Sequence, residues 1–260
     1  MALQPSRSGR RSPLAATGNY ERSGGVLNRT CLPSDIIAFV VFCRLRYRLT
    51  PGCLSEILAP RGIAVTYEAI RDWETKLLPI MGDVLRKRRH GTRCGPGVSW
   101  YIDETYLRVS GKWTYLYRAV DRHGNLIDAM MSEHRDMEAA KAFFRSAKAT
   151  MGFRPERVTT DGHGSYPRAI RSVLGKTVGH RTRAYLNNRP EQNHRGIKGR
   201  IRCKRGFKSQ NTASRFCPEH GEIRDLLRLR RRHNEVVSAS IRRFRFARGA
   251  RAGLDIMQNT

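Results

Sequence analysis

The sequence predicts an α/β fold: a mixed-sheet domain preceded by a small all-α helix-turn-helix domain. Two observations support this class. Apolar residues recur at helical spacing over residues 33–78, and the hydrophobic period changes to two after residue 98. The 260 residues, of which 39% are hydrophobic, are sufficient to bury a core.

The helical part contains three predicted helices with recognisable start and stop signals. The first extends from Pro33 to about residue 48. Thr50 followed by proline is a typical N-terminal cap, and Gly62 is the kind of residue that ends a helix. Thr66 caps the third helix, whose inward stripe is Ile70, Trp73, Leu77 and Leu78.

Two helices joined by a tight glycine-containing turn form the helix-turn-helix pattern. In such modules the first residues of the second helix contact base edges. Here the DNA-reading candidates are Thr66, Tyr67 and Arg71. The alternative is an ordinary helical hairpin in which Arg71 only pairs with acids on its own helix.

Alternating residues after position 98 predict an antiparallel meander, followed by helices and strands in turn. This order gives a sheet that is antiparallel on one side and parallel on the other. The expected strands are 99–109, 113–120, 126–131, 157–161 and 177–180, and the expected helices are 136–151, 166–174 and 190–205.

These patterns divide the chain into five parts. Residues 1–30 are rich in Ser, Gly and Arg and are expected to be a disordered basic arm. The other expected parts are a helix-turn-helix DNA-binding domain (31–85), a linker (86–97), a catalytic domain (98–210) and a basic helical C-terminal region (211–260).

The net charge of the chain indicates an anionic binding partner. Lys and Arg number 50 against 22 Asp and Glu, which gives +28. Nucleic acid is the leading partner because phosphates bind Lys and Arg with release of counterions, and an anionic membrane surface is the alternative. The longest apolar run has eight residues (36–43), too short for a membrane span of about 20.

The basic excess is concentrated at the C-terminal end. Residues 195–260 hold 18 Lys and Arg against 5 acids, a net of +13. This composition predicts a surface for the DNA backbone, with Arg230 and Arg231 as phosphate contacts. Leu226, Leu227 and Leu229 lie on one helical stripe, so part of this region is expected to pack.

Three acids in this basic chain stand where strands and a helix begin or end. Asp103 lies within the first strand, Asp161 ends the fourth, and Glu191 lies in the first turn of the last predicted helix. The two strands are expected to be neighbours, so the carboxylates converge. Such a trio suits two divalent ions about 4 Å apart for phosphoryl transfer. Taken singly, each is more readily explained as a turn former or helix cap.

Basic side chains follow these acids. His194 and Lys198 lie at i+3 and i+7 from Glu191, on one face of the predicted helix. Lys198 is placed to hold a phosphate, and the alternative is a solvated helix face. Cys203, Cys217 and His220 lack the close pair typical of a zinc site, so no zinc is expected.

Several motifs carry a resemblance to a known family. Three segments, YIDETYLRVSGKWTYLYRAVDRHGNLID, VTTDGHGSYPRAIR and YLNNRPEQNHRGIKGR, resemble the insertion sequence 6 family of bacterial DDE transposases. The match includes RD at residues 135–136, between the first two segments, and extends downstream through RGFKS (205–209) and RFC (215–217). Upstream, LTPGCLSEILAPRGIAVTYEAIRDW resembles the helix-turn-helix of that family. The similarity covers about residues 33–250.

The resemblance implies an RNase H-like catalytic domain with Asp103, Asp161 and Glu191 as its acid triad. It implies Mg²⁺ or Mn²⁺, strand transfer at element ends, replicative cointegrate formation, and a homo-oligomer on paired terminal inverted repeats and target DNA. Lys198 matches a basic position of the family, seven residues after its Glu. The implied location is the bacterial cytoplasm, at the nucleoid, with no membrane association.

The sequence therefore predicts a transposase that joins DNA strands in transposition, recombination and DNA integration. One alternative is a catalytically decayed copy or a regulator that uses only the helix-turn-helix. Another is a nuclease with the same metal site, which would cut DNA without joining it.

Overall fold

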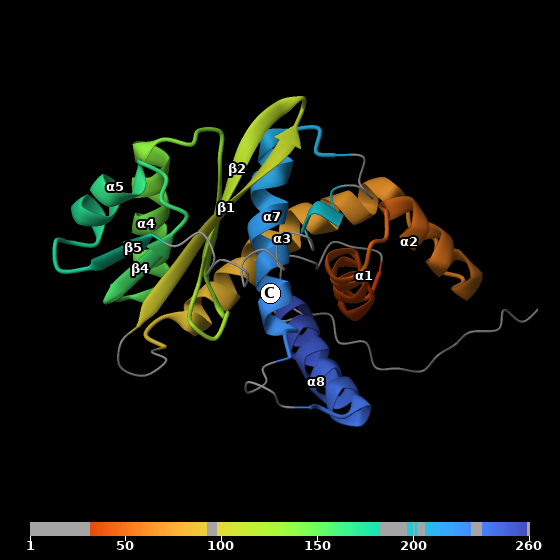
Figure 1. Ribbon diagram of the computed structural model, residues 1–260. Helices are drawn as coiled ribbons and strands as arrows, with labels where there is room; N and C mark the ends of the chain where they lie inside the picture. The colour runs from red at the N-terminus through yellow and green to blue at the C-terminus, as the bar shows by residue number, and fades with distance from the viewer. Residues whose placement is uncertain are drawn as a thin grey trace, which may run out of the picture.

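The computed structural model describes residues 32–92, 98–182, 197–199, 201, 206–229 and 236–258. A five-stranded sheet lies between two groups of helices (Figure 1). Helices α4 (Met137–Met151) and α5 (Tyr166–Val173) cover one face, and α7 (Gln210–Leu226) and α3 (Tyr67–Arg89) cover the other. The sheet thus separates two hydrophobic cores.

The sheet is mixed, as the sequence predicts. Its order is β3-β2-β1-β4-β5. The strands β1 (Ser99–Val109), β2 (Lys112–Val120) and β3 (Leu126–Ser132) are antiparallel neighbours. The short strands β4 (Arg157–Thr160) and β5 (Gly179–Thr182) extend the sheet in parallel from β1.

The last strand begins two residues later than the predicted range of 177–180. The Val178 N–H bonds to the Gly175 carbonyl and closes the turn after α5. Pairing starts only at Gly179, whose N–H donates to the Glu156 carbonyl at 2.9 Å. Val178 is apolar because it packs on the core from this turn. The apolar pattern therefore placed the start of the predicted strand two residues too early.

The N-terminal helices are α1 (Ser34–Arg46), α2 (Pro51–Leu58), a single 3₁₀ turn over Ala59–Arg61, and α3. The predicted caps are confirmed. The Thr50 side chain accepts a hydrogen bond from the Cys53 N–H, and Thr66 accepts one from the Ala69 N–H. Gly62 has φ of 73°, the left-handed conformation that glycine adopts most readily at a helix end.

Helix α3 continues to Arg89, so the start of the expected linker at residue 86 is helical. The apolar stripe of α3 packs in one core with α1, α7, α8 (Ala239–Gln258) and the face of the sheet that α7 covers. A long helix therefore connects the N-terminal helices to the sheet layer. The division into domains stays a prediction.

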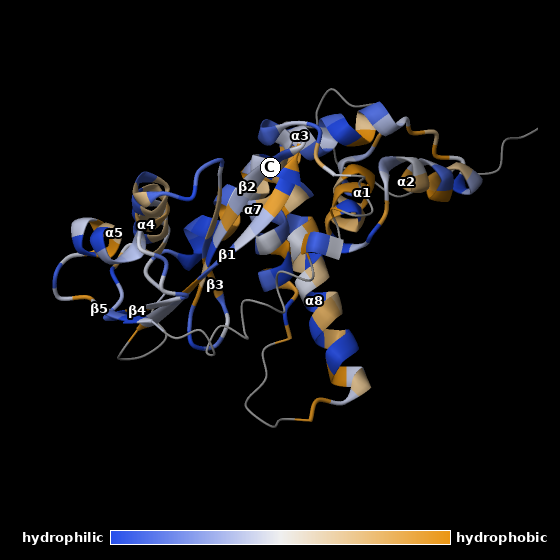
Figure 2. Ribbon diagram, turned by 45° about the horizontal axis from the view of Figure 1, so that its top comes forward, coloured by the Kyte–Doolittle hydropathy of each residue, from blue (hydrophilic) through white to orange (hydrophobic). Residues whose placement is uncertain are grey.

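Helix α7 is more deeply buried than the sequence predicts. Packing in this region was expected from Leu226, Leu227 and Leu229, yet Ala213 and Phe216 are already in the core. Cys217 and His220 are also buried in α7, where the His220 ring stacks on Phe216. Figure 2 shows the mixture of polar and apolar residues along α7 and α8. None of the described helices is long and apolar enough to cross a membrane.

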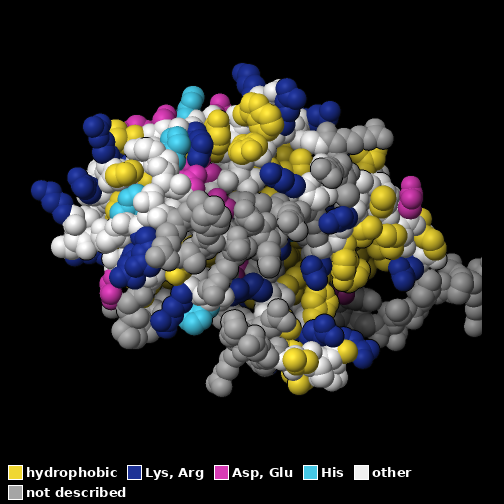
Figure 3. Space-filling view, in the orientation of Figure 1, with side chains coloured by type: hydrophobic (Ala, Val, Ile, Leu, Met, Phe, Trp, Pro, Cys, Tyr) yellow, Lys and Arg dark blue, Asp and Glu magenta, His cyan; other side chains and the backbone are white. Residues whose placement is uncertain are grey.

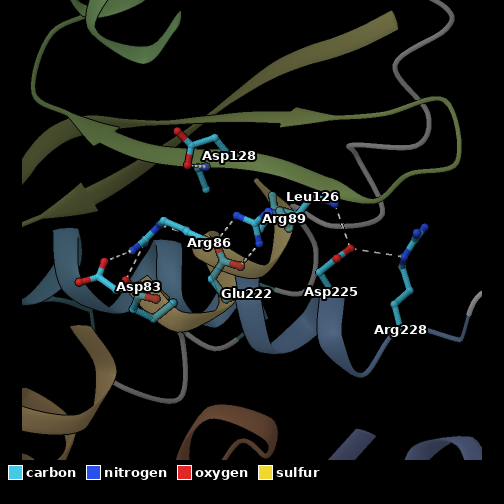
Figure 4. Close-up of polar contacts among 10 residues, drawn as sticks. Asp83, Arg86, Arg89, Leu126, Asp128, Glu222, Asp225 and Arg228 are labelled. Atoms are coloured by element: carbon cyan, nitrogen blue, oxygen red, sulfur yellow. Dashed lines mark hydrogen bonds and ion pairs between the residues drawn. The ribbon is translucent and has the colours of Figure 1, made fainter. Parts of the chain in front are cut away.

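A cluster of buried charges joins α3 to α7; we call Arg86, Arg89, Glu219 and Glu222 the α3–α7 charge cluster. Figure 4 shows Arg86, Arg89 and Glu222. Arg86 Nη2 lies 2.7 Å from Glu219 Oε1, and Arg89 Nη2 lies 2.8 Å from Glu222 Oε1. The two glutamate side chains are only 6% and 1% exposed. The cluster therefore fixes α3 on the sheet layer.

The pKa of Glu219 is raised to about 7 by burial, against the opposing attraction of Arg86. Among the described residues, its Oε2 atom has no hydrogen-bond partner. The folded state therefore binds a proton more tightly than the unfolded state, whose pKa is near 4.5. Stability should fall as pH rises from about 4.5 through about 7.

We expect Glu219→Gln to flatten this fall by on the order of 2 kcal/mol between pH 5 and 8. The measurement is urea unfolding at four pH values, with the slope against pH as the readout. Glu138→Gln, on an exposed side chain of α4, is the control and should keep the wild-type slope. An unchanged slope for Glu219→Gln would mean that Glu219 stays ionised throughout.

Candidate active site

Two of the three predicted acids lie level on neighbouring strands. Asp103 is a half-buried residue of β1, and Asp161 directly follows β4. In the parallel β1–β4 pair, Tyr101 lies opposite Thr159. Continuing this register by two residues sets Asp103 level with Asp161. The structure therefore brings the backbone positions of these two acids to the same end of β4.

Asp161 is held by two hydrogen bonds. Its Oδ2 accepts from Arg135 Nη2 at 3.0 Å, and its Oδ1 accepts from the His163 backbone N–H at 3.1 Å. The intervening Gly162 has φ of 93°, which the turn requires. The carboxylate remains 37% exposed, so it is oriented and still accessible.

Arg135 links Asp161 to a buried acid on β1. Its guanidinium also bonds to Glu104, which in turn accepts a hydrogen bond from the Tyr166 hydroxyl. Burial and the nearby Glu104 raise the pKa of Tyr166, so the hydroxyl stays protonated as a donor. Glu104 follows Asp103 on the strand and therefore points to the opposite face. Asp161 is thus supported from the α5 side of the sheet.

The sequence reasoning missed Arg135, Glu104 and Tyr166. Arg135 lies within the RD motif, and Glu104 is an acid that follows the buried Trp100 and Ile102 on the same face of β1. That acid on the buried face is the signal that could have identified the support. The role of Glu104 depends on Arg135 and Tyr166, which are 31 and 62 residues away in the sequence.

The third acid cannot be placed beside them. Glu191 and His194 lie outside the residues that the structure describes. Over the described ranges, no group of three His, Cys, Asp or Glu is arranged to hold a metal ion. Asp103 and Asp161 supply carboxylate oxygens, which are the donors that Mg²⁺ prefers. A divalent-ion site at Asp103 and Asp161 stays a prediction.

Lys198 lies in the short helical segment 197–199, with its Nζ 5.3 Å from the centroid of the Tyr106 ring. Ile197 is buried in the core, and Phe207 forms a parallel bridge with Val109 of β1. The chain that follows Glu191 therefore returns to β1, three residues beyond Asp103. Lys198 therefore lies beside β1, the strand that carries Asp103, and its role stays a prediction.

The predicted DNA-reading residues are at the start of α3. Thr66 is the N-cap, and Tyr67 is exposed. The Arg71 guanidinium lies 5.3 Å from the centroid of the Tyr67 ring. Figure 1 shows that this end of α3 is opposite the end that packs on α7. Arg230 and Arg231 lie outside the described residues.

Comparisons with known proteins identify the family. A family model described as a DDE domain matches residues 97–246. The transposase of insertion sequence-like element IS431mec from Staphylococcus aureus is 37% identical over 183 residues, which cover 69% of this chain and 78% of the relative. The transposase of IS257 in transposon Tn4003, also from Staphylococcus aureus, has the same identity and coverage.

Among solved structures, the HTLV-2 integrase catalytic core domain in complex with magnesium aligns with 41% of this chain and 70% of its own, with 17% identity and a TM-score of 0.34. The family is shown by the DDE-domain match, which covers more than half of the chain, and by the two relatives. This chain belongs to the DDE transposase family that includes the transposases of IS431 and IS257.

Proposed function

We propose that this chain is an insertion sequence 6-type transposase that joins the ends of its own element to target DNA in a metal-dependent reaction. The observation that carries the proposal is the level placement of Asp103 and Asp161 on adjacent strands of a DDE-family domain. The sheet order β3-β2-β1-β4-β5 supports an RNase H-like catalytic domain. Replicative cointegrate formation in the bacterial cytoplasm, at the nucleoid, is part of the proposal.

Asp103, Asp161 and Glu191 would hold Mg²⁺ or Mn²⁺, in two sites. When bound, such ions make a 3′-hydroxyl nucleophilic and stabilise the leaving oxygen. Arg135 and the His163 N–H fix the direction of the Asp161 carboxylate. Lys198 is proposed to hold a phosphate of the reacting strand, with His194 contacting DNA nearby.

DNA recognition is proposed to divide between two regions. Thr66, Tyr67 and Arg71 at the start of α3 read the terminal inverted repeats. Arg230 and Arg231 contact phosphates without reading sequence. A homo-oligomer would hold both element ends together with the target. The net charge of +28 supports extensive contact with double-stranded DNA.

Arg71→Ala should lower the preference for the element's own ends over random DNA by about 5- to 100-fold. Each base contact contributes about 1–3 kcal/mol of discrimination. Affinities for both DNAs are measured at one fixed salt concentration. Arg230→Ala is the comparison and should weaken both DNAs equally. An unchanged preference in Arg71→Ala would assign sequence reading to another part of the chain.

The proposed activity is tested with a labelled, pre-cut inverted-repeat end, a target plasmid and Mg²⁺. We expect a covalently joined product. A protein that cuts the DNA without joining it would be a nuclease. A protein that binds the ends but neither cuts nor joins would be a regulator or a decayed copy. Either result would contradict the proposal.

A further inference from the structure

Two large aromatic side chains are exposed on the hairpin of β1 and β2. Tyr106 is 58% exposed and Trp113 is 55% exposed. Their ring centroids are 5.5 Å apart at an interplanar angle of 84°. The neighbouring Leu107 and Val109 are buried on the other face of the hairpin. The core is therefore completed without the two exposed rings, which we call the aromatic pair.

A cation lies over each ring. The Arg108 guanidinium is 5.6 Å from the centroid of the Trp113 ring, and Lys198 Nζ is 5.3 Å from that of Tyr106. Residues 106–113 also contain Lys112 and no acid. Figure 3 shows hydrophobic side chains flanked by Lys and Arg above this hairpin. Rings next to cations suit a strand that offers both bases and phosphates.

The aromatic pair lies a short distance along the β1–β2 hairpin from Asp103. Tyr106 is three residues beyond Asp103, or about 10 Å along β1 at about 3.4 Å a residue, and it lies on the opposite face of the strand from Asp103. Trp113 pairs with Arg108, five residues beyond Asp103, or about 17 Å. Successive nucleotides of one strand are about 3.4 Å apart in a duplex and farther apart in an extended unpaired strand. The pair is therefore a few nucleotides' length from Asp103, and a DNA strand reaches it by passing from one face of β1 to the other.

We propose that Tyr106 and Trp113 form a stacking surface for unpaired bases of the DNA strand that adjoins the reacting end. The inference rests on the proposed function and specifies the form of DNA that the site takes. In a duplex, neighbouring bases cover each other's faces, so only an unpaired base presents its face to an exposed ring. The flanking Arg108 and Lys198 favour a polyanion over an apolar protein partner.

The probe is 2-aminopurine, a fluorescent base whose emission is quenched by stacking. It replaces each of the first six bases of a pre-cut end whose terminal bases are unpaired. Binding is measured with the full chain in EDTA, so that no reaction occurs. We expect Trp113→Ala to raise the emission several-fold at one or more of these six positions. It should also weaken binding of this end about tenfold.

Matched variants separate stacking from other effects. Trp113→Phe keeps a ring and should retain most of the wild-type quenching. Phe244→Ala removes an exposed ring from α8 and should change nothing. Thermal unfolding of each variant checks that the hairpin still folds. Tyr106→Ala provides a second test if Trp113→Ala proves unstable.

Equal emission for wild type and both alanine variants, with folding intact, would overturn the proposal. A change in oligomeric state without any change in emission would also overturn it, since the pair would then contact protein. Joining assays separate the two proposals. A wild-type protein that joins DNA without quenching any position overturns the stacking surface alone. Quenching without joining supports the surface and overturns the proposed activity.

Discussion

Replacing Asp103 or Asp161 with asparagine is expected to slow DNA strand joining by at least about a thousandfold while DNA binding is kept. Asparagine preserves the volume of the side chain and removes its negative charge. Loss of one ligand to a catalytic metal removes several kcal/mol of charge stabilisation, and each 1.36 kcal/mol is tenfold in rate. The measurement is single-turnover joining of a pre-cut end in Mg²⁺, with affinity measured in parallel.

Asp136→Asn is a matched control for these variants. Asp136 caps α4 by accepting a hydrogen bond from the Ala139 N–H, and asparagine caps a helix about as well. Its joining rate should therefore stay near that of wild type. Near-normal joining by Asp103→Asn or by Asp161→Asn would remove that residue from the site.

Replacing Glu222 with alanine is expected to destabilise the fold by about 3–5 kcal/mol. Glu222 is 1% exposed and pairs with Arg89, so the variant leaves a largely buried guanidinium without its carboxylate. Breaking one side of a buried ion pair typically has this effect. The measurement is the free energy of unfolding in urea at pH 7.

A second variant tests whether pairing is the cause. Replacing Arg89 with methionine and Glu222 with leucine together removes both charges and should recover most of the lost stability. Asp255→Ala is the control, since its pair with Arg251 is exposed and should contribute less than about 1 kcal/mol. A loss of similar small size in Glu222→Ala would show that the α3–α7 charge cluster does not hold the helices together.

Local signals in the sequence were sufficient for the elements with strong caps or strong alternation. Thr50, Thr66 and Asp136 each cap the helix that they were expected to cap, because a cap depends on neighbours three residues away. Strand β1 has the expected bounds because its polar and apolar residues alternate along its length.

The burial of α7 could not be predicted in this way. Glu219, His220 and Glu222 are typical surface residues, and their pattern predicts exposure. They are buried because Arg86 and Arg89 neutralise the two acids from a helix 133 residues away in sequence. Such compensation is visible only once α3 and α7 are packed together.

The candidate site, too, was predictable from the sequence only in part. The placement of Asp103 and Asp161 on adjacent strands follows from strand order, since β4 pairs in parallel with the first part of β1 and ends beside Asp103. Arg135 was part of a quoted motif, but its contact with Asp161 depends on how the turn before α4 reaches across the sheet. The position of Glu191 relative to these residues stays a prediction.

The central claim, that Asp161 is a metal ligand for strand joining, is tested most directly by exchanging its oxygen donor for sulfur. Thiolate binds the hard Mg²⁺ poorly and accepts the softer Mn²⁺ more readily. Joining of a pre-cut end is measured for wild type, Asp161→Cys and Asp161→Ala in each metal. We predict that wild type joins in both metals, Asp161→Cys joins only in Mn²⁺, and Asp161→Ala joins in neither. Full joining by Asp161→Cys in Mg²⁺, or equal activity of the cysteine and alanine variants in Mn²⁺, would contradict the claim.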